Sequence, residues 1–246
     1  MKKKYGVLGV VGACVVAASV TWAGDPLYYG PNLCKHPQFD CIKVKSGQSW
    51  KRLFPDNQDR DLVQRLNRTY NSLWAGKVIV VPKNLKELTI LDIAPFPKKM
   101  EPHEKQIIVD QDKLAWGAYD ANGKLLNWGP IASGLDQCPK SKKSCKTMSG
   151  IFRMFSKENS RCSSDVYPIG RGGAPMPYCM YFHKGFAMHG SNDIPGRRAS
   201  HGCVRMFTRD AKWLNEEFVE ISTDENDQKG TQVIVRPATT SGRASS

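Results

Sequence analysis

Residues 186–206 read Phe-Ala-Met-His-Gly-Ser-Asn-Asp-Ile-Pro-Gly-Arg-Arg-Ala-Ser-His-Gly-Cys-Val-Arg-Met. Two of the chain's five histidines share this short stretch with a cysteine. Cys203 is a candidate nucleophile and His189 a candidate base, because a thiol attacks as its thiolate and a nearby histidine commonly produces one. We therefore expect the rest of the chain to be organised around this stretch.

Three neighbours of the thiol extend this interpretation. His201 precedes Cys203 by two residues, so in an extended chain both side chains would lie on one face. Gly202 would let backbone amides approach a developing oxyanion. Arg205 has the planar fork of donors that suits a substrate carboxylate.

Two other interpretations of the same residues stay open at this point. A single cysteine is commonly a small buried hydrophobe. A zinc site would also use cysteine and histidine, although the stretch has no second close cysteine of the zinc-finger type. The residues alone do not decide among the three.

The order of the residues resembles a known signature. Met188-His189-Gly190-Ser191 followed by Ser200-His201-Gly202-Cys203-Val204-Arg205-Met206 is similar to the active-site motif of the L,D-transpeptidases, whose catalytic domain is of the YkuD type. The resemblance implies that Cys203 takes an acyl group and that His189 is its general base. It also implies that the carbonyl of Gly190 orients this histidine.

The other polar and glycine positions of the motif are candidate site residues. Those with candidate catalytic roles are His201 and Gly202, and those with candidate substrate-binding roles are Arg205, Ser191 and Ser200. Ten residues separate His189 from Ser200, fewer than the family usually has, which predicts a short loop at the acceptor pocket. Because a thiol and positioned amides suffice for acyl transfer, we expect no metal and no organic cofactor.

Residues 1–23 resemble a secretory signal. Lysines precede an uncharged run from Tyr5 to Val20, and Ala23 is a small residue suited to cleavage. The run is short for a membrane-spanning helix, which needs ~20 apolar residues. An uncleaved membrane anchor and a lipid anchor at Cys14 remain alternatives. We expect an exported protein of the periplasm or cell envelope.

Export changes the meaning of the cysteines. The chain has eight, of which Cys14 falls in the leader. An odd number in an oxidising compartment suggests disulfides plus one free thiol. Sequence does not fix connectivity, but pairing by proximity and the role of Cys203 predict three bridges with Cys203 left free. The predicted bridges are Cys34–Cys41, Cys138–Cys145 and Cys162–Cys179.

A small α+β module precedes the motif. Its predicted elements are a strand over Ile42–Lys45, a helix capped by Ser49, a helix from Asp59 or Asp61, and a strand over Lys77–Pro82. The opening Val44-Lys45-Ser46-Gly47-Gln48-Ser49 and the closing Leu73–Pro82 resemble a LysM domain. The resemblance implies binding of glycan that contains N-acetylglucosamine. The alternative is a packing module that only positions the enzyme.

The remaining pattern completes the predicted organisation. Short alternating strands with turn signals, and one amphipathic helix from Thr208 to Glu220, predict a mainly β catalytic domain, a sandwich or barrel with one packed helix. The predicted divisions are the signal 1–23, an N-terminal extension 24–40, the LysM-like module 41–85, a linker 86–104, the catalytic domain 105–237 and a disordered tail 238–246.

The formal net charge of +13 suits an anionic partner. The sequence has no nucleic-acid-binding motif, so nucleic acid is not an expected partner. We expect a monomer that acts on the stem peptides and glycan of peptidoglycan and meets membrane only through a retained signal or lipid anchor. The expected reaction is L,D-transpeptidation. The alternatives are a carboxypeptidase or amidase with the same Cys/His site, and a peptidoglycan-binding protein without activity.

Overall fold

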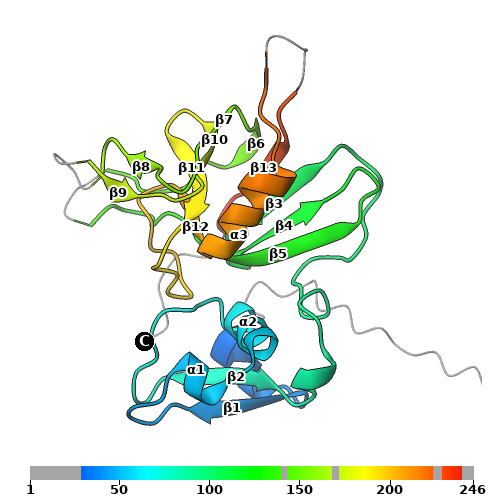
Figure 1. The fold of residues 1–246 in the computed structure, drawn as a ribbon, viewed down its shortest axis with the longest axis vertical. Helices are drawn as coiled ribbons and strands as arrows, with labels where there is room; N and C mark the ends of the chain where they lie inside the picture. Colours follow the sequence, from blue (N-terminus) through cyan, green and yellow to red (C-terminus); the bar gives the residue numbers. More distant parts are fainter. Residues whose placement is uncertain (1–28, 140–142, 168–171, 224–228, 240–246) are drawn as a thin grey trace, which may run out of the picture.

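The computed structural model describes residues 29–139, 143–167, 172–223 and 229–239 (Figure 1). The expected signal at 1–23 and most of the expected tail lie outside the described residues. Within the described ranges, none of the helices combines the length and apolar character needed to cross a bilayer.

The N-terminal module contains two strands and two helices in the predicted order. After the 3-10 turn η1 (Gly30–Lys35) come β1 (Phe39–Lys43), α1 (Trp50–Leu53), α2 (Asn57–Leu66) and β2 (Val78–Pro82). β1 and β2 are antiparallel, with Cys41 opposite Val80. The helices pack on this two-stranded sheet, and the module's core is built from Val44, Trp50, Phe54, Val63 and Ile79.

The two helix starts test the predicted caps. Ser49 caps α1 as expected, since its hydroxyl accepts from the backbone N–H of Arg52. The prediction for the second helix is wrong, because α2 begins earlier. The Asp56 carboxylate accepts from the N–H groups of Gln58 and Asp59 and so satisfies two donors at that end.

The rest of the chain forms one large sheet. After the 3-10 turn η2 (Leu85–Glu87), its strands are β3 (Gln106–Asp110), β4 (Ala115–Tyr119), β5 (Leu125–Ala132), β6 (Gly150–Arg153), β7 (Ser156–Lys157), β10 (Met180–His183), β11 (Phe186–Gly190), β12 (Val204–Met206) and β13 (Gln232–Arg236). The nine are ordered β6-β13-β3-β4-β5-β12-β11-β10-β7. A separate hairpin joins β8 (Ser163–Ser164) to β9 (Ala174–Pro175).

The prediction of a mainly β catalytic domain is confirmed, but the expected sandwich or barrel is a single curled sheet. β6 and β10 stand far apart in the strand order, yet they contact each other, because the sheet curls round one core. That core includes Ile107, Trp116, Met188 and Val233 on the inner face. The alternation of each strand sends the intervening side chains to the outer face.

The outer face of the sheet is covered by the segment predicted as a linker. Ala94 and Phe96 are buried there against Ile108, Tyr119 and Trp128. Their burial gives residues 86–104 a packing role on the sheet.

One helix crosses the inner face, as the sequence predicts (Figure 1). It consists of α3 (Thr208–Trp213) and a π-helical turn η3 (Leu214–Phe218), and it buries Leu214 and Phe218 in the core. It ends before Glu220. The residue at the N-cap position is Phe207, which makes no side-chain cap, and Thr208 is already helical.

The three predicted disulfides are present. They join Cys34 to Cys41, Cys138 to Cys145 and Cys162 to Cys179, and Cys203 is the free cysteine among the described residues. Each bridge closes a short loop, so proximity in sequence was a sufficient guide to the pairing.

The module and the sheet meet through a buried ion pair. The Arg65 guanidinium on α2 donates to both carboxylate oxygens of Asp210 on α3, at 3.0 and 2.6 Å. It also donates to the carbonyl of Trp128 on β5. Gly129 makes this possible, because a Cβ there would stand 2.2 Å from the Asp210 carboxylate. The pair fixes the module against α3 and β5 of the catalytic domain.

Candidate active site

Two parallel strands bring the candidate residues together. β11 and β12 pair with His189 opposite Arg205 and with Met188 opposite Val204. Met188, Val204 and Met206 are fully buried in the core. Since successive side chains alternate between faces, His189, Cys203 and Arg205 lie on the opposite face from that core.

This opposite face lines a cavity of about 550 Å³. The candidates that line it are His189, Ser191, Ser200, His201, Gly202, Cys203 and Arg205. Other contributions come from the β8–β9 hairpin and its flanks, including Asp165 and Tyr167, and from Tyr181 on β10. The structure thus brings the predicted motif into one concave site.

The His189 ring has a defined tautomer. It is buried, and its Nδ1 lies 2.8 Å from the carbonyl oxygen of Gly190, the group expected to orient it. A carbonyl only accepts, so Nδ1 carries the proton and Nε2 is left as a base. Burial, opposed by the Gly190 carbonyl and assisted by the charge of Arg205, lowers the pKa of His189 to about 4. The imidazole is therefore neutral at neutral pH.

The Cys203 thiol lies just before β12 and is half-buried. Burial raises its pKa, while the backbone N–H of Ala187 and the charge of Arg205 act in the opposite direction. Its Sγ donates to the carbonyl of Gly185 at 3.7 Å. The resting group is thus a protonated thiol that needs a base to become a nucleophile.

The chain from His201 to Cys203 forms a turn. It is not the extended segment that would place both side chains on one face of a strand. Gly202 has φ +129°, and a Cβ there would lie 3.0 Å from the Phe186 ring. Its N–H donates to the hydroxyl of Ser200, which in turn donates to the carbonyl of Cys203. Ser200 is buried and is engaged in closing the turn. The Gly202 amide is likewise engaged, so its role at an oxyanion stays a prediction.

His201 reaches the cavity from this turn. Its ring packs against Tyr167, with 4.9 Å between ring centres. Burial, followed by the charge of Arg205, lowers the pKa of His201. It shares the cavity with Cys203 as expected, although the turn and not an extended strand brings it there.

The guanidinium of Arg205, expected to bind a substrate carboxylate, already has one partner. Its guanidinium donates to Asp193 Oδ2 at 2.9 Å, leaving other donors for a ligand. Ser191 lies beside this pair, and its hydroxyl accepts from the N–H of Asp193 at 3.1 Å. Sequence reasoning missed Asp193, although it lies within the motif, since an exposed aspartate in a loop reads as an ordinary solvated residue.

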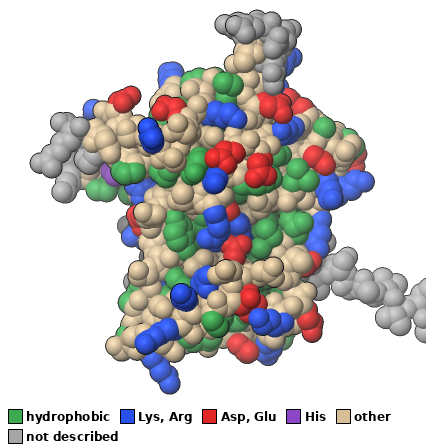
Figure 2. All heavy atoms as spheres, in the orientation of Figure 1, with side chains coloured by type: hydrophobic (Ala, Val, Ile, Leu, Met, Phe, Trp, Pro, Cys, Tyr) green, Lys and Arg blue, Asp and Glu red, His purple; other side chains and the backbone are tan. Residues whose placement is uncertain are grey.

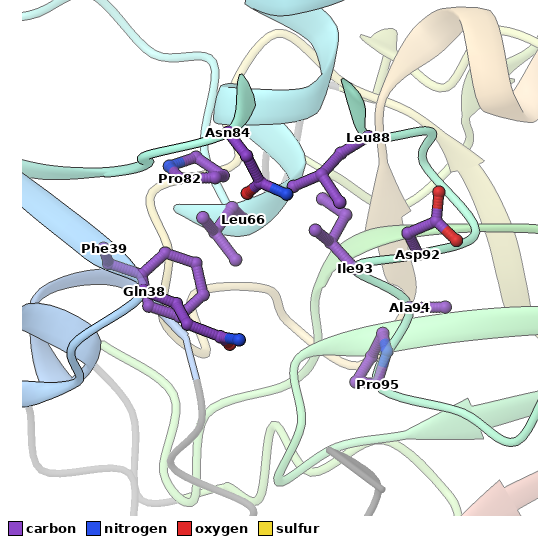
Figure 3. Close-up of a pocket in the computed structure, with 10 residues that line it drawn as sticks. All are labelled: Gln38, Phe39, Leu66, Pro82, Asn84, Leu88, Asp92, Ile93, Ala94 and Pro95. Carbon is purple, nitrogen blue, oxygen red and sulfur yellow. The ribbon is translucent and has the colours of Figure 1, made fainter. Parts of the chain in front are cut away.

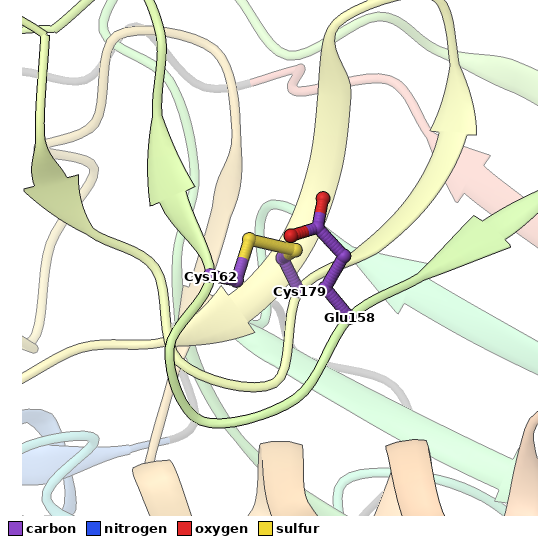
Figure 4. A group of neighbouring side chains, drawn as sticks. All are labelled: Glu158, Cys162 and Cys179. Carbon is purple, nitrogen blue, oxygen red and sulfur yellow. A yellow bond between two sulfur atoms is a disulfide. The ribbon is translucent and has the colours of Figure 1, made fainter.

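Two further features lie outside the cavity. Glu158 lies beside the Cys162–Cys179 disulfide (Figure 4), and cysteines joined to each other are not thiolate ligands for a metal. A second cavity of about 180 Å³ lies between the module and the 86–104 segment (Figure 3). Basic and acidic side chains are interspersed on the face drawn in Figure 2.

Comparison with known proteins places these features in context. Residues 104–235, just over half of the chain, match the model of the YkuD family, described as the L,D-transpeptidase catalytic domain. We find no match among curated proteins.

Among solved structures, one shares the architecture and a second shows a weaker likeness. An L,D-transpeptidase from Xylanimonas cellulosilytica shares the fold, with a TM-score of 0.50, 22% identity, and coverage of 72% of this chain and 78% of that chain. An L,D-transpeptidase from Stackebrandtia nassauensis aligns with a TM-score of 0.45 and 22% identity, over 59% of this chain and 62% of that chain.

Proposed function

The chain belongs to the YkuD family of L,D-transpeptidase catalytic domains, which are cysteine-dependent acyltransferases, and from this premise we propose that it is an exported enzyme that crosslinks peptidoglycan. The observation that carries the proposal is the geometry of His189. With Nδ1 fixed on the Gly190 carbonyl, Nε2 is free as a base on the cavity face that Cys203 shares.

The first half-reaction forms a thioester. His189 takes the thiol proton, and the Cys203 thiolate attacks the carbonyl of the third residue of a tetrapeptide stem. The tetrahedral intermediate collapses, the bond to the terminal D-alanine breaks, and the leaving amine takes the proton from the imidazolium. The acyl group remains on sulfur.

The second half-reaction releases the acyl group from Cys203. An amine of another stem, or of a protein to be tethered to the wall, attacks the thioester and gives up a proton to His189. The sulfur leaves as thiolate and regains a proton from the imidazolium. Within this scheme Arg205 would bind a carboxylate of the stem through its remaining donors, and Ser191 and Ser200 would flank it.

Two alternatives use the same chain differently. If water accepts the acyl group, the same residues make a carboxypeptidase or an amidase. If the site does not turn over, the chain is a peptidoglycan-binding protein. A cavity that holds a thiol and a neutral histidine base supports an enzyme over a binding protein, since wall binding alone needs no thiol in the site.

The N-terminal module is proposed as a LysM-like glycan-binding unit over residues 41–85. Its strand–helix–helix–strand order supports this. So does Trp74, which is 60% exposed on the loop between α2 and β2, because an aromatic ring that faces solvent can stack on a sugar ring. The proposed organisation keeps a signal at 1–23, an extension at 24–40, a connecting segment at 86–104, a catalytic domain at 105–237 and a tail at 238–246.

Digestion of purified wall tests the enzyme. The protein should convert tetrapeptide stems to L,D-crosslinked products identified by mass, and Cys203→Ala and His189→Gln should each lose orders of magnitude of rate. His103→Gln, which alters an exposed histidine away from the cavity, should retain the rate of the unaltered protein. Trimmed tripeptides without crosslinks would favour the hydrolase, and activity in Cys203→Ala would exclude the scheme.

Sedimentation with whole wall tests the module. Trp74→Ala should lower the bound fraction while leaving turnover of a soluble stem peptide unchanged. The matched control is Leu126→Ala, another exposed apolar side chain, on β5. Equal binding of all three proteins would reduce the module to a packing role.

A further inference from the structure

The module contacts the rim of the cavity as well as α3 and β5. Directly after α2, Thr69 forms an antiparallel bridge with Pro195, and the Tyr70 hydroxyl donates to the carbonyl of Ser191. The Tyr70 ring packs edge-on against Phe207, with 4.4 Å between ring centres. In Figure 1 the loop between β11 and β12 descends towards the module. This short loop is therefore held from outside the catalytic domain.

Asn71 uses both ends of its side-chain amide on that loop. Its Nδ2 donates to Asp193 Oδ1 at 2.8 Å, and its Oδ1 accepts from the N–H of Ile194 at 2.8 Å. An amide has a donor and an acceptor, whereas a carboxylate only accepts. Asparagine therefore satisfies both contacts together, and aspartate at the same position would face the Asp193 carboxylate.

Asp193 connects Asn71 to the active site. Its second oxygen, Oδ2, takes one N–H of Arg205 at 2.9 Å. Arg205 lies opposite His189 in the paired strands and lines the cavity with Cys203. Three residues thus form a chain of hydrogen bonds from the module to the guanidinium beside the nucleophile.

We propose that Asn71 is a positioning residue of the active site, which holds Asp193 so that the free donors of Arg205 face the substrate and part of its positive charge is neutralised. The inference rests on the proposed function, because it assigns Arg205 to a stem carboxylate. It makes the N-terminal module a structural part of the catalytic site.

The geometry allows a reciprocal exchange as the test. Asn71→Asp keeps the acceptor for Ile194 but sets two carboxylates against each other. Asp193→Asn removes the carboxylate and keeps an oxygen for Arg205. Combining the two restores one amide and one carboxylate in the reverse order, so both hydrogen bonds can form again. Asn122→Asp, in an exposed turn of the catalytic sheet, is the matched control.

Steady-state kinetics with a tetrapeptide donor give the first readout. Asn71→Asp should raise KM about tenfold, the cost of one charge-assisted contact, with a smaller change in kcat. The double variant should recover at least half of that loss on a logarithmic scale. The inference is overturned if Asn71→Asp matches Asn122→Asp, or if the double variant is no better than Asn71→Asp.

Alkylation of Cys203 by iodoacetamide at pH 7 gives a readout that needs no substrate. The charged and titratable groups that line the cavity around the thiol are His189, His201, Asp165, Tyr167, Tyr181, Asp193 and Arg205. Relative to the unaltered protein, Asp193→Asn leaves Arg205 less neutralised and should speed alkylation roughly threefold. Asn71→Asp adds a negative charge and should slow it by a similar factor.

The exchange should return the alkylation rate to that of the unaltered protein, because the net charge is restored. Two single variants that change the rate in the same direction would contradict the inference. If the tetrapeptide is not turned over but these opposed shifts appear, the proposed function fails while the electrostatic link from Asn71 and Asp193 to Cys203 stands.

Discussion

Two of the contacts between the N-terminal module and the catalytic domain are opposite in character. Beside α3 and the middle strand β5, the side chains of Arg65 and Asp210 are 4% and 2% exposed and form an ion pair with two hydrogen bonds. At the cavity, the Asp193 side chain between Asn71 and Arg205 is 58% exposed. Both contacts depend on segments far apart in sequence, and both use carboxylates.

The difference lies in what surrounds the charges. In the interior, removing one partner leaves an unpaired charge away from water, which is strongly destabilising. At the surface, water replaces the lost partner, so an exposed ion pair contributes ~0–1 kcal/mol. The buried contact therefore serves stability, while the exposed contact can orient Arg205 without the fold depending on it.

Arg65→Ala should cause the largest loss of stability among the variants that test this comparison. The free energy of unfolding should fall by about 3–5 kcal/mol, because Asp210 remains buried without its guanidinium. Denaturant titration measures it. Arg209→Ala, which removes the 45% exposed partner of Asp61 on the same face, should cost under ~1 kcal/mol.

The double variant Arg65→Met with Asp210→Leu tests whether the unpaired charge causes this loss of stability. Both charges then leave the interior together, so most of the lost stability should return. A double variant as unstable as Arg65→Ala would show that the hydrogen bond to Trp128, not the ion pair, holds the contact.

His189 extends the comparison to a single buried group. Its pKa falls from an ordinary 6.5 to about 4 on folding, so the unfolded chain binds the proton first as pH drops. As the pH falls from 6.5 to 4, protonation of His189 in the unfolded chain alone lowers the free energy of unfolding by about 3 kcal/mol in total. Above pH 6.5 this loss is absent. The pH dependence of unfolding measures this. His189→Gln should remove that part of the slope, and an unchanged slope would contradict the buried neutral histidine.

Asp193→Asn is the smallest expected change in stability. Unfolding should shift by less than ~1 kcal/mol, since the carboxylate it removes is largely solvated. The same variant should change alkylation of Cys203, as described above. A loss of stability comparable to that of Arg65→Ala would erase the distinction between the two contacts.

Local features were predictable because short-range signals determine them. The strand at Gln106–Asp110 follows from its run of β-branched residues, and the disulfides follow from cysteines close in sequence. The order of His189 and Cys203 within one motif located the cavity. In each case the decisive residues lie within 17 positions of one another in the sequence.

Contacts between distant segments were not predictable. Arg65 and Asp210 are 145 positions apart, and an arginine on a helix normally indicates a solvated face. Asn71 follows a helix and carries no catalytic signature. The turn at Gly202 was missed for a different reason, because residue spacing reveals neither its positive φ nor the Phe186 ring that lies against it.

Intact-protein mass spectrometry after rapid mixing with a tetrapeptide stem tests the central claim most directly. The account predicts an added mass equal to the acyl part of the stem without its terminal D-alanine, located on the peptide that contains Cys203 and absent from Cys203→Ala. It also predicts that His189→Gln accumulates this adduct far more slowly. A stem processed with no adduct at any time, or an adduct that persists in Cys203→Ala, would contradict it.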